Sequence, residues 1–203
     1  MTATRLPPKP TVRPMTADEF WEFGHRPENE NKSFELIRGE VIEMSRPTRQ
    51  HGYVCARFTT ILTNWSFEVK VGYIASNDSG VLLERNPDTV VGPDVAYYTD
   101  ANTFAEVHPR WGEHPPVLAV EVLSPNDRMS KVNAKIAGYL RGGVRVVWLV
   151  DYEDQKITIY RPDRSLIVLE STDTIAGDPE LPGFACAVAE FFRMPGVPAA
   201  GAP

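Results

Sequence analysis

The chain has 203 residues, of which 42% are hydrophobic and 24% are charged, and its formal net charge is −6. This is the composition of a globular domain with a buried core, and its acidity argues against a protein that coats nucleic acid through a basic surface. No apolar run approaches the roughly 20 residues that cross a bilayer, and the N-terminus lacks the apolar segment of a secretory signal. Cys55 and Cys186 form no disulfide or zinc pattern and are expected to be small core residues. We therefore expect a cytoplasmic protein that makes no contact with a membrane.

Prolines and small residues mark the two ends of the chain. Residues 1–14 are rich in proline and are expected to form a disordered arm, and residues 193–203 are expected to form a flexible Pro/Gly/Ala tail. Residues 15–192 lie between these ends and show no internal repeat. We expect them to form one folded domain.

The domain is expected to begin with a short helix and a hairpin. Thr16 and Glu19 match a capping box, so a helix should begin there and end by Gly24. Two strand-like runs joined by a tight turn predict a β-hairpin over residues 33–44. The acidic members of this hairpin are Glu35, Glu40 and Glu43.

A long helix and several strands are expected next. Apolar residues at helical spacing predict a helix over about residues 50–66, with His51 in its first turn. Strands are predicted over residues 69–74, 80–84 and 95–98, followed by a loop over residues 100–116.

The second half of the domain reads as a strand-helix-strand unit. Residues 117–123 form a run that is apolar on both faces, which is typical of a strand covered on both sides of a sheet. A helix should follow from about residue 129 to 142 and lead to an apolar strand over residues 144–150. Such a crossover is right-handed and joins parallel strands. Further strands at 157–160 and 165–169 and a short C-terminal helix with Val188, Phe191 and Phe192 complete a mixed α/β domain.

Two carboxylates are candidates for a metal site. Glu121 lies inside the apolar strand, where an isolated ionised carboxylate is costly, so it should be paired, protonated or bound to a metal. Asp94 opens another strand directly after a proline. If the two strands are neighbours, the carboxylates could share a divalent cation, and oxygen ligands suit Mg²⁺ or Mn²⁺. A nearby lysine would orient a metal-bound water and stabilise the charge that gathers on phosphorus during phosphodiester hydrolysis.

The helix after Glu121 offers two lysines for this role. Helical angles place one apolar stripe against the sheet, with Lys135 about 40° outside its edge and Lys131 about 80° away. Lys135 can therefore bring its ammonium group to the rim of the sheet, whereas Lys131 is expected in solvent. Arg128 also flanks the stripe and competes for the same place. The stripe consists of Met129, Val132, Ile136, Tyr139 and Leu140.

The order of these residues resembles the PD-(D/E)XK nucleases, in which Pro-Asp precedes a glutamate in an apolar strand. The chain is most similar to one branch, the Uma2 family (DUF820) of restriction-endonuclease-like proteins, over about residues 15–192. Leu123 stands where the parent pattern has its lysine, and the family is thought to supply this lysine from the following helix. The matching motifs are FELIRGE (34–40), His51 at a helix start, GPDV (92–95), VEVLSP (120–125), Lys135, and GV…WLVD (143–151).

The resemblance implies a restriction-endonuclease-like fold, with a central mixed β-sheet flanked by helices and an N-terminal β-hairpin extension. It also implies a Mg²⁺- or Mn²⁺-dependent endonuclease that acts on nucleic acid, with DNA as the expected substrate. Asp94 and Glu121 would be the metal ligands and Lys135 the catalytic lysine. Glu40 and His51 match family positions too and are expected at the edge of the site.

Structural roles stay open for each candidate. Glu121 could be a buried acid paired with a basic residue, Asp94 a turn residue, and Lys135 a surface residue. Glu40 could be a hairpin-end charge and His51 a locally bonded helix residue. A second functional hypothesis is a binding or interaction module on the same fold without turnover. A homodimer is compatible with either hypothesis, through the hairpin or the regions of Trp65 and Trp111.

Overall fold

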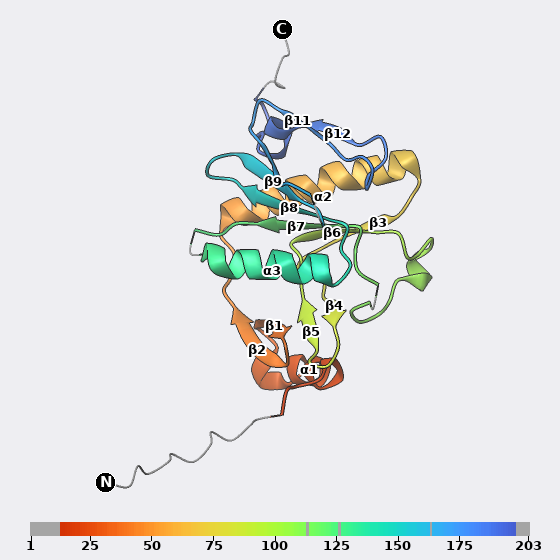
Figure 1. The fold of residues 1–203 in the computed structure, drawn as a ribbon, viewed down its shortest axis with the longest axis vertical. Helices are drawn as coiled ribbons and strands as arrows, with labels where there is room; N and C mark the ends of the chain where they lie inside the picture. Colours follow the sequence, from red (N-terminus) through yellow and green to blue (C-terminus); the bar gives the residue numbers. More distant parts are fainter. Residues whose placement is uncertain (1–12, 113, 126, 163, 198–203) are drawn as a thin grey trace, which may run out of the picture.

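The computed structural model of the chain describes residues 13–197 except residues 113, 126 and 163. Most of the expected N-terminal arm and the last part of the expected tail lie outside the described residues. Within the described residues the fold consists of a central sheet, a smaller sheet and a two-stranded sheet, combined with three α-helices (Figure 1). The helices and 3-10 turns are α1 (Ala17–Gly24), α2 (Arg49–Val69), α3 (Met129–Arg141), η1 (Pro27–Asn29), η2 (Phe104–Glu106) and η3 (Val188–Phe191).

The central sheet has six strands in the order β10-β9-β8-β7-β6-β3. Only β7 and β8 run parallel among these neighbours, and α3 is the crossover that joins them. The predicted strand-helix-strand unit is therefore confirmed, and so is the predicted mixed α/β fold. The strands are β3 (Tyr73–Ser76), β6 (Val95–Tyr98), β7 (Leu118–Val122), β8 (Val146–Asp151), β9 (Lys156–Tyr160) and β10 (Ile167–Leu169).

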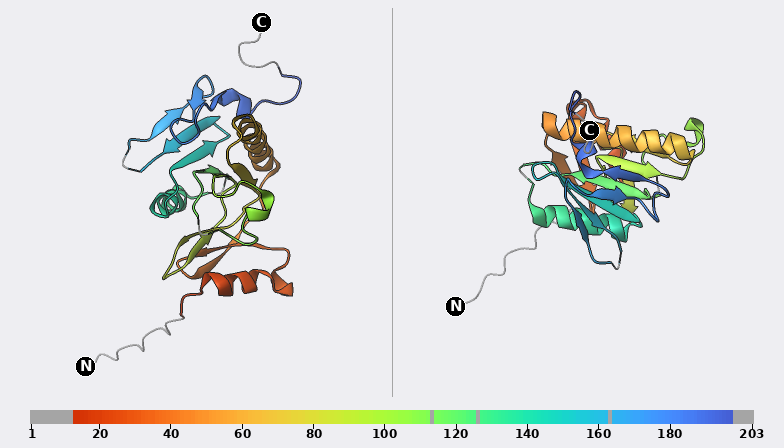
Figure 2. Two further views of the ribbon diagram at one scale, coloured as in Figure 1. Left: turned by 90° about the vertical axis from the view of Figure 1, so that its right-hand side faces the viewer. Right: turned by 90° about the horizontal axis from the view of Figure 1, so that it is seen from above.

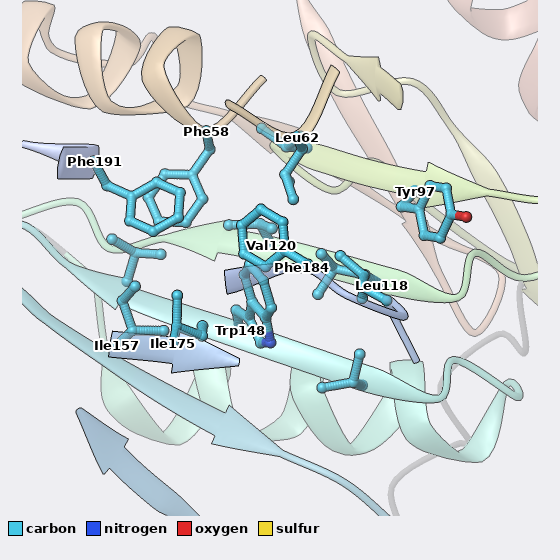
Figure 3. Packing of buried hydrophobic residues seen from close by; sticks show 14 of the residues in the cluster. Phe58, Leu62, Tyr97, Leu118, Val120, Trp148, Ile157, Ile175, Phe184 and Phe191 are labelled. Atoms are coloured by element: carbon cyan, nitrogen blue, oxygen red, sulfur yellow. The ribbon is translucent and has the colours of Figure 1, made fainter. Parts of the chain in front are cut away.

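Helices cover both faces of the central sheet, with α2 on one side and α3 on the other (Figure 2). Because side chains alternate along a strand, β7 contributes Leu118, Val120 and Val122 to the large core that also contains Phe58 of α2. Ala119 belongs instead to the smaller core beneath α3. The same alternation places Glu121 on the α3 side of the sheet. Figure 3 shows the large core, in which side chains of α2 and η3 meet those of β7 and β8.

The smaller sheet and α1 form a layer next to α3 (Figure 1). The strand order is β2-β1-β5-β4, and Phe20 of α1 packs on Leu36, Leu82 and Val90. The predicted hairpin is confirmed as β1 and β2. The chain passes from β5 through three residues into β6, so this connection ties the smaller sheet to the central one. The strands are β1 (Ser33–Ile37), β2 (Glu40–Met44), β4 (Val81–Glu84) and β5 (Thr89–Val91).

Several local expectations are corrected. α2 continues to Val69, where Lys70 ends it in a left-handed conformation, so the following strand begins only at Tyr73. The three-residue strands β5, β11 (Thr174–Ala176) and β12 (Ala185–Ala187) were not predicted, whereas the equally short β10 was, because β10 lies in a longer run of large apolar residues over 166–169. The expected C-terminal helix is the 3-10 turn η3.

The aromatic residues suggested for self-association differ in burial. Trp65 is only 7% exposed and packs edge-on against Tyr97 and Phe184, so it offers no surface for a homodimer. Trp111 is half-buried against α1. Among the residues that the structure describes, no helix combines the length and apolar character that a membrane span requires.

Candidate active site

Two neighbouring strands bring the predicted carboxylates to one edge of the central sheet. β6 and β7 are antiparallel, with Val95 opposite Val120. Asp94, directly before β6, therefore lies beside the end of β7 that carries Glu121. The backbone N–H of Val122 donates a hydrogen bond to Asp94 Oδ2 at 2.7 Å. The expectation that these two strands are neighbours is confirmed.

Lys135 lies between two carboxylates. Its Nζ atom is 2.9 Å from Glu121 Oε2 and 2.9 Å from Glu35 Oε1. It also donates a hydrogen bond to the carbonyl oxygen of Gly92 at 3.3 Å. Tyr139, one turn later on α3, donates from its hydroxyl to Glu121 Oε1 at 2.6 Å. Both oxygens of Glu121 are therefore held by side chains of the same helix.

The helix periodicity placed the lysines correctly. Lys131 is exposed, whereas the side chain of Lys135 is only 20% exposed and reaches the sheet. Met129, which was expected in the buried stripe, is 48% exposed, because it stands in the first turn of α3, beyond the end of β7. Ile136 and Tyr139 form the buried part of the stripe.

The hairpin brings Glu35 to this cluster. Glu35 is 8% exposed, and its Oε1 atom accepts a hydrogen bond from the Gly92 N–H at 3.3 Å in addition to its contact with Lys135. Glu40 follows the turn at the far end of the hairpin, where it is exposed, and its carboxylate makes no hydrogen bond or ion pair within the described ranges. Because Phe34 and Leu36 point to the opposite face of β1 from Glu35, they did not indicate its burial; the signal on its own face is the apolar residue Ile37, which packs against the core beneath α3.

His51 lies against Asp94 at the start of α2. Its Nε2 atom is 3.0 Å from the Val122 carbonyl oxygen and 3.3 Å from Asp94 Oδ1. Burial lowers the pKa of His51, but the hydrogen bond and the negative charge of Asp94 outweigh it, so the pKa is raised. Thr48 caps α2 by accepting a hydrogen bond from the His51 backbone N–H at 3.2 Å. This cap fixes the start of α2 and so places His51 in the first turn of the helix.

Cys55 stands one turn after His51 on α2 and contacts the other ring nitrogen of that histidine. Its Sγ atom is 3.4 Å from His51 Nδ1, and one ligand atom each from His51, Cys55 and Asp94 lies within 4.8 Å of the others. Such a trio is of the type that binds zinc. Without a metal, burial, followed by the charges of Asp94 and Asp78, raises the pKa of the Cys55 thiol, so a metal ion bound there would have to displace the thiol proton. The simple core role expected for Cys55 is therefore incomplete.

Asp78 is a further carboxylate of the cluster that sequence reasoning did not select. It lies in the turn between β3 and β4, where Asn77 and Asp78 both have positive φ angles of 64° and 54°. A Cβ atom on Gly92 would lie 2.4 Å from the Asp78 carbonyl oxygen, so only glycine allows this close approach. Asp78 is exposed as a residue, but the atoms packed around its carboxyl group, and then the charge of Asp94, raise its pKa. A polar turn is common, so nothing local in the sequence indicated this position.

The cluster holds more acids than bases. Burial is the main cause that raises the pKa of Glu121 to about 7, with Asp94 contributing in the same direction and Lys135 opposing it. Burial acts against the charge of Lys135 as well, but Glu121 and Glu35 outweigh it and raise the pKa of the ammonium group. Lys135 is therefore a permanent cation at neutral pH.

This surplus of carboxylates fits a divalent cation. Besides Lys135, only His51 among the side chains described above can add positive charge, whereas the acids are Glu35, Asp78, Asp94 and Glu121. A carboxylate oxygen has two lone pairs, so Glu121 can keep its bonds to Lys135 and Tyr139 and still face a metal. Oxygen donors of this kind suit Mg²⁺ or Mn²⁺.

Comparisons with known proteins agree with the fold. Residues 19–189 match the Uma2 family, whose description is "Putative restriction endonuclease". The fold is similar to the crystal structure of a putative nuclease belonging to DUF820 from Anabaena variabilis ATCC 29413, with a TM-score of 0.74 and 21% sequence identity. This similarity covers 88% of the present chain and 98% of the other. No curated protein matches the chain.

Proposed function

Because the chain belongs to the Uma2 family, we propose that it is a divalent-metal-dependent endonuclease that hydrolyses phosphodiester bonds, with DNA as its substrate and the cytoplasm as its location. The observation that carries the proposal is the position of the Lys135 ammonium group, 2.9 Å from Glu121, which lies on the strand next to the one that Asp94 directly precedes. An acid pair with one buried lysine is the minimum set of groups for this reaction.

Asp94 and Glu121 are the residues that would hold Mg²⁺ or Mn²⁺, with Glu35 and Asp78 near enough to add negative charge. When bound, such an ion supplies a Lewis acid and a more acidic water molecule. The chain itself fixes the ligands. The Val122 N–H and His51 orient Asp94, while Tyr139 and Lys135 orient Glu121.

Lys135 acts through its charge in this proposal. Since its pKa is raised above the usual value for lysine, it cannot accept a proton near neutral pH. Its ammonium group donates hydrogen bonds, and it would stabilise the negative charge that develops on the phosphoryl oxygens and hold the attacking water. Its attachment to a helix packed on the sheet keeps this charge in place before substrate binds.

The test is cleavage of single- and double-stranded DNA and RNA in the presence of Mg²⁺, Mn²⁺ or EDTA. We expect metal-dependent products that fall at least about a hundredfold in Asp94→Asn, Glu121→Gln and Lys135→Met, as happens when one electrostatic group of an active site is removed. Lys131→Met and Glu40→Gln are the matched controls, because both residues are exposed, and they should keep full activity.

Metal binding gives an independent readout. Mn²⁺ should raise the melting temperature of the wild type and should do so much less in Asp94→Asn. Anomalous scattering from Mn²⁺-soaked crystals should show an ion between Asp94 and Glu121. Cleavage that survives both carboxylate substitutions would refute the assignment. Binding of nucleic acid without cleavage in any metal would instead support a module without turnover.

A further inference from the structure

A small aromatic pocket lies directly beside the carboxylate cluster. Its volume is about 170 Å³, and its rings come from α1, from β1 and from the loop before β7. Asp78 and Gly92, which belong to the candidate active site, line it as well. The pocket therefore adjoins the place where the scissile phosphate would lie. The ring-bearing residues are Phe20, Trp21, Phe34 and Trp111.

The rings of this pocket hold one another in position. Phe20 stacks on Trp111 with ring centroids 5.5 Å apart, and Trp21 meets Trp111 edge-on at 5.1 Å. Phe20 is buried, whereas Trp21, Phe34 and Trp111 are half-buried. Trp21 also meets the His25 ring, with centroids 4.2 Å apart, so a flat ligand would stack on the part of the half-buried rings that stays exposed. The contacts among the rings mean that little side-chain freedom is lost when it does so.

Basic side chains stand around the aromatic rings. Lys32 and His25 line the pocket, and the Arg110 guanidinium lies 5.1 Å from the centre of the Trp21 ring. Lys32 and Arg110 each form an exposed ion pair, with Glu43 at 3.9 Å and with Asp18 at 3.7 Å. Exposed pairs of this kind contribute little to stability and exchange readily. These cations can therefore turn to a phosphate. On a chain of net charge −6, rings and cations together form a local surface for an aromatic anion.

We propose that this pocket binds one unpaired nucleobase of a nucleic-acid strand whose neighbouring phosphodiester enters the carboxylate cluster; this inference rests on the proposed nuclease function. A volume of about 170 Å³ is well below the roughly 300–1,000 Å³ of pockets for drug-sized ligands, so it admits a single ring system and no base pair. A base inside a duplex cannot present its faces to protein rings unless it leaves the stack. The substrate is therefore single-stranded, or unpaired at this nucleotide.

The proposal predicts which feature of the substrate matters. Stacking on aromatic side chains tolerates any base, because every base has a π face. Cleavage should then prefer single strands over duplexes of the same sequence and show little dependence on base identity. Removing one base, while leaving the backbone intact, should weaken binding by about tenfold at a single position relative to the cleaved bond.

The experiment measures binding and cleavage separately with the full chain. Short single-stranded oligodeoxynucleotides carry either 2-aminopurine or an abasic site, moved one position at a time. Binding is followed by fluorescence anisotropy with Ca²⁺ in place of Mg²⁺, because Ca²⁺ is also bound by oxygen ligands. We expect 2-aminopurine fluorescence to be quenched at one position, and the abasic site at that position to weaken binding about tenfold.

Protein variants show whether the pocket makes this contact. Trp21→Ala should weaken binding of the intact strand about tenfold, Trp21→Phe should restore most of it, and neither should weaken binding of the abasic strand further, since one contact cannot be lost twice. Phe67→Ala is the matched control, because Phe67 is an aromatic residue of α2 that is 78% exposed and does not line the pocket.

Several outcomes would overturn the inference. The first is an abasic site that does not weaken binding at any position. The second is full additivity of the losses in binding caused by Trp21→Ala and by the abasic site. The third is a dimer that depends on Trp21 in sedimentation experiments, since the pocket would then hold a second copy of the chain. If a base stacks in the pocket but no metal supports cleavage, the nuclease function fails and the base pocket stands. If cleavage occurs without dependence on any base, the base pocket fails and the nuclease function stands.

Discussion

Replacing Lys135 by methionine tests the buried charge cluster most directly. Methionine keeps most of the length of the side chain and its helix propensity, but it removes the cation that lies 2.9 Å from both Glu35 and Glu121. The side chains of these glutamates are only 10% and 13% exposed, so water replaces the lost partner poorly. The variant therefore leaves two carboxylates without their shared cation.

The expected loss of stability depends on pH. At pH 8, removal of one partner of a buried ion pair should cost about 3–5 kcal/mol, which corresponds to a melting temperature lower by roughly 10 °C for a chain of this size. The pKa of Glu121 is about 7 in the wild type, above its unfolded value of 4.5, and should rise further without Lys135. A carboxyl with a raised folded pKa contributes most stability below the unfolded pKa and loses it as the pH rises through the folded pKa. Lys135, whose pKa is also raised, contributes constantly below pH 10. The difference between the two proteins should therefore grow from pH 5 to pH 8.

Urea denaturation followed by tryptophan fluorescence at pH 5, 6, 7 and 8 measures this difference. Lys131→Met, on the same helix but exposed, should change stability by less than about 0.5 kcal/mol at every pH. The double variant Lys135→Met/Glu121→Gln should recover part of the loss at pH 8, because one unpaired carboxylate is gone. Equal stabilities of Lys135→Met and Lys131→Met, or a loss that does not change with pH, would refute the reasoning.

Three further predictions concern backbone contacts and thiols. Gly92→Ala should cost about 3 kcal/mol and reduce metal binding, because its Cβ atom would lie 2.4 Å from the Asp78 carbonyl oxygen; a thermal melt and Mn²⁺ titration check this, and an unchanged protein would contradict the close approach. Gly52→Ala in α2 meets no atom within 4 Å and should raise the free energy of unfolding by about 0.5–1 kcal/mol, as urea denaturation will show. Partial burial raises the pKa of both thiols, that of Cys186 to about 11, so a disulfide reagent at pH 8 should label neither quickly until urea is added; fast labelling of the folded chain would argue against this shielding of Cys55 and Cys186.

Local patterns were enough to predict most of the architecture. The hairpin, the long helix α2 and the β7-α3-β8 unit each repeat an apolar period over enough residues to reveal their type. The three-residue strands β5, β11 and β12 lie in no longer run of large apolar residues that could show a period, and β5 pairs with β1, which is distant in the sequence. The N-terminal boundary of β3 was wrong for a related reason, since apolar residues at the end of α2 also fit a strand.

The residues of the candidate site also fall into those that local sequence patterns reveal and those that only the folded structure reveals. The sequence by itself determined Asp94, Glu121 and Lys135 as candidates, because a carboxylate within an apolar strand and a lysine beside an apolar helical stripe are visible locally. Only the tertiary structure decided that Glu35 rather than Glu40 shares Lys135, and that Asp78 joins the acids through its contact with Gly92. The distance between a hairpin, a turn and a helix is set by the packing of two sheets, which no local period encodes. The aromatic pocket beside them exists for the same reason, since its rings come from segments that only folding brings together.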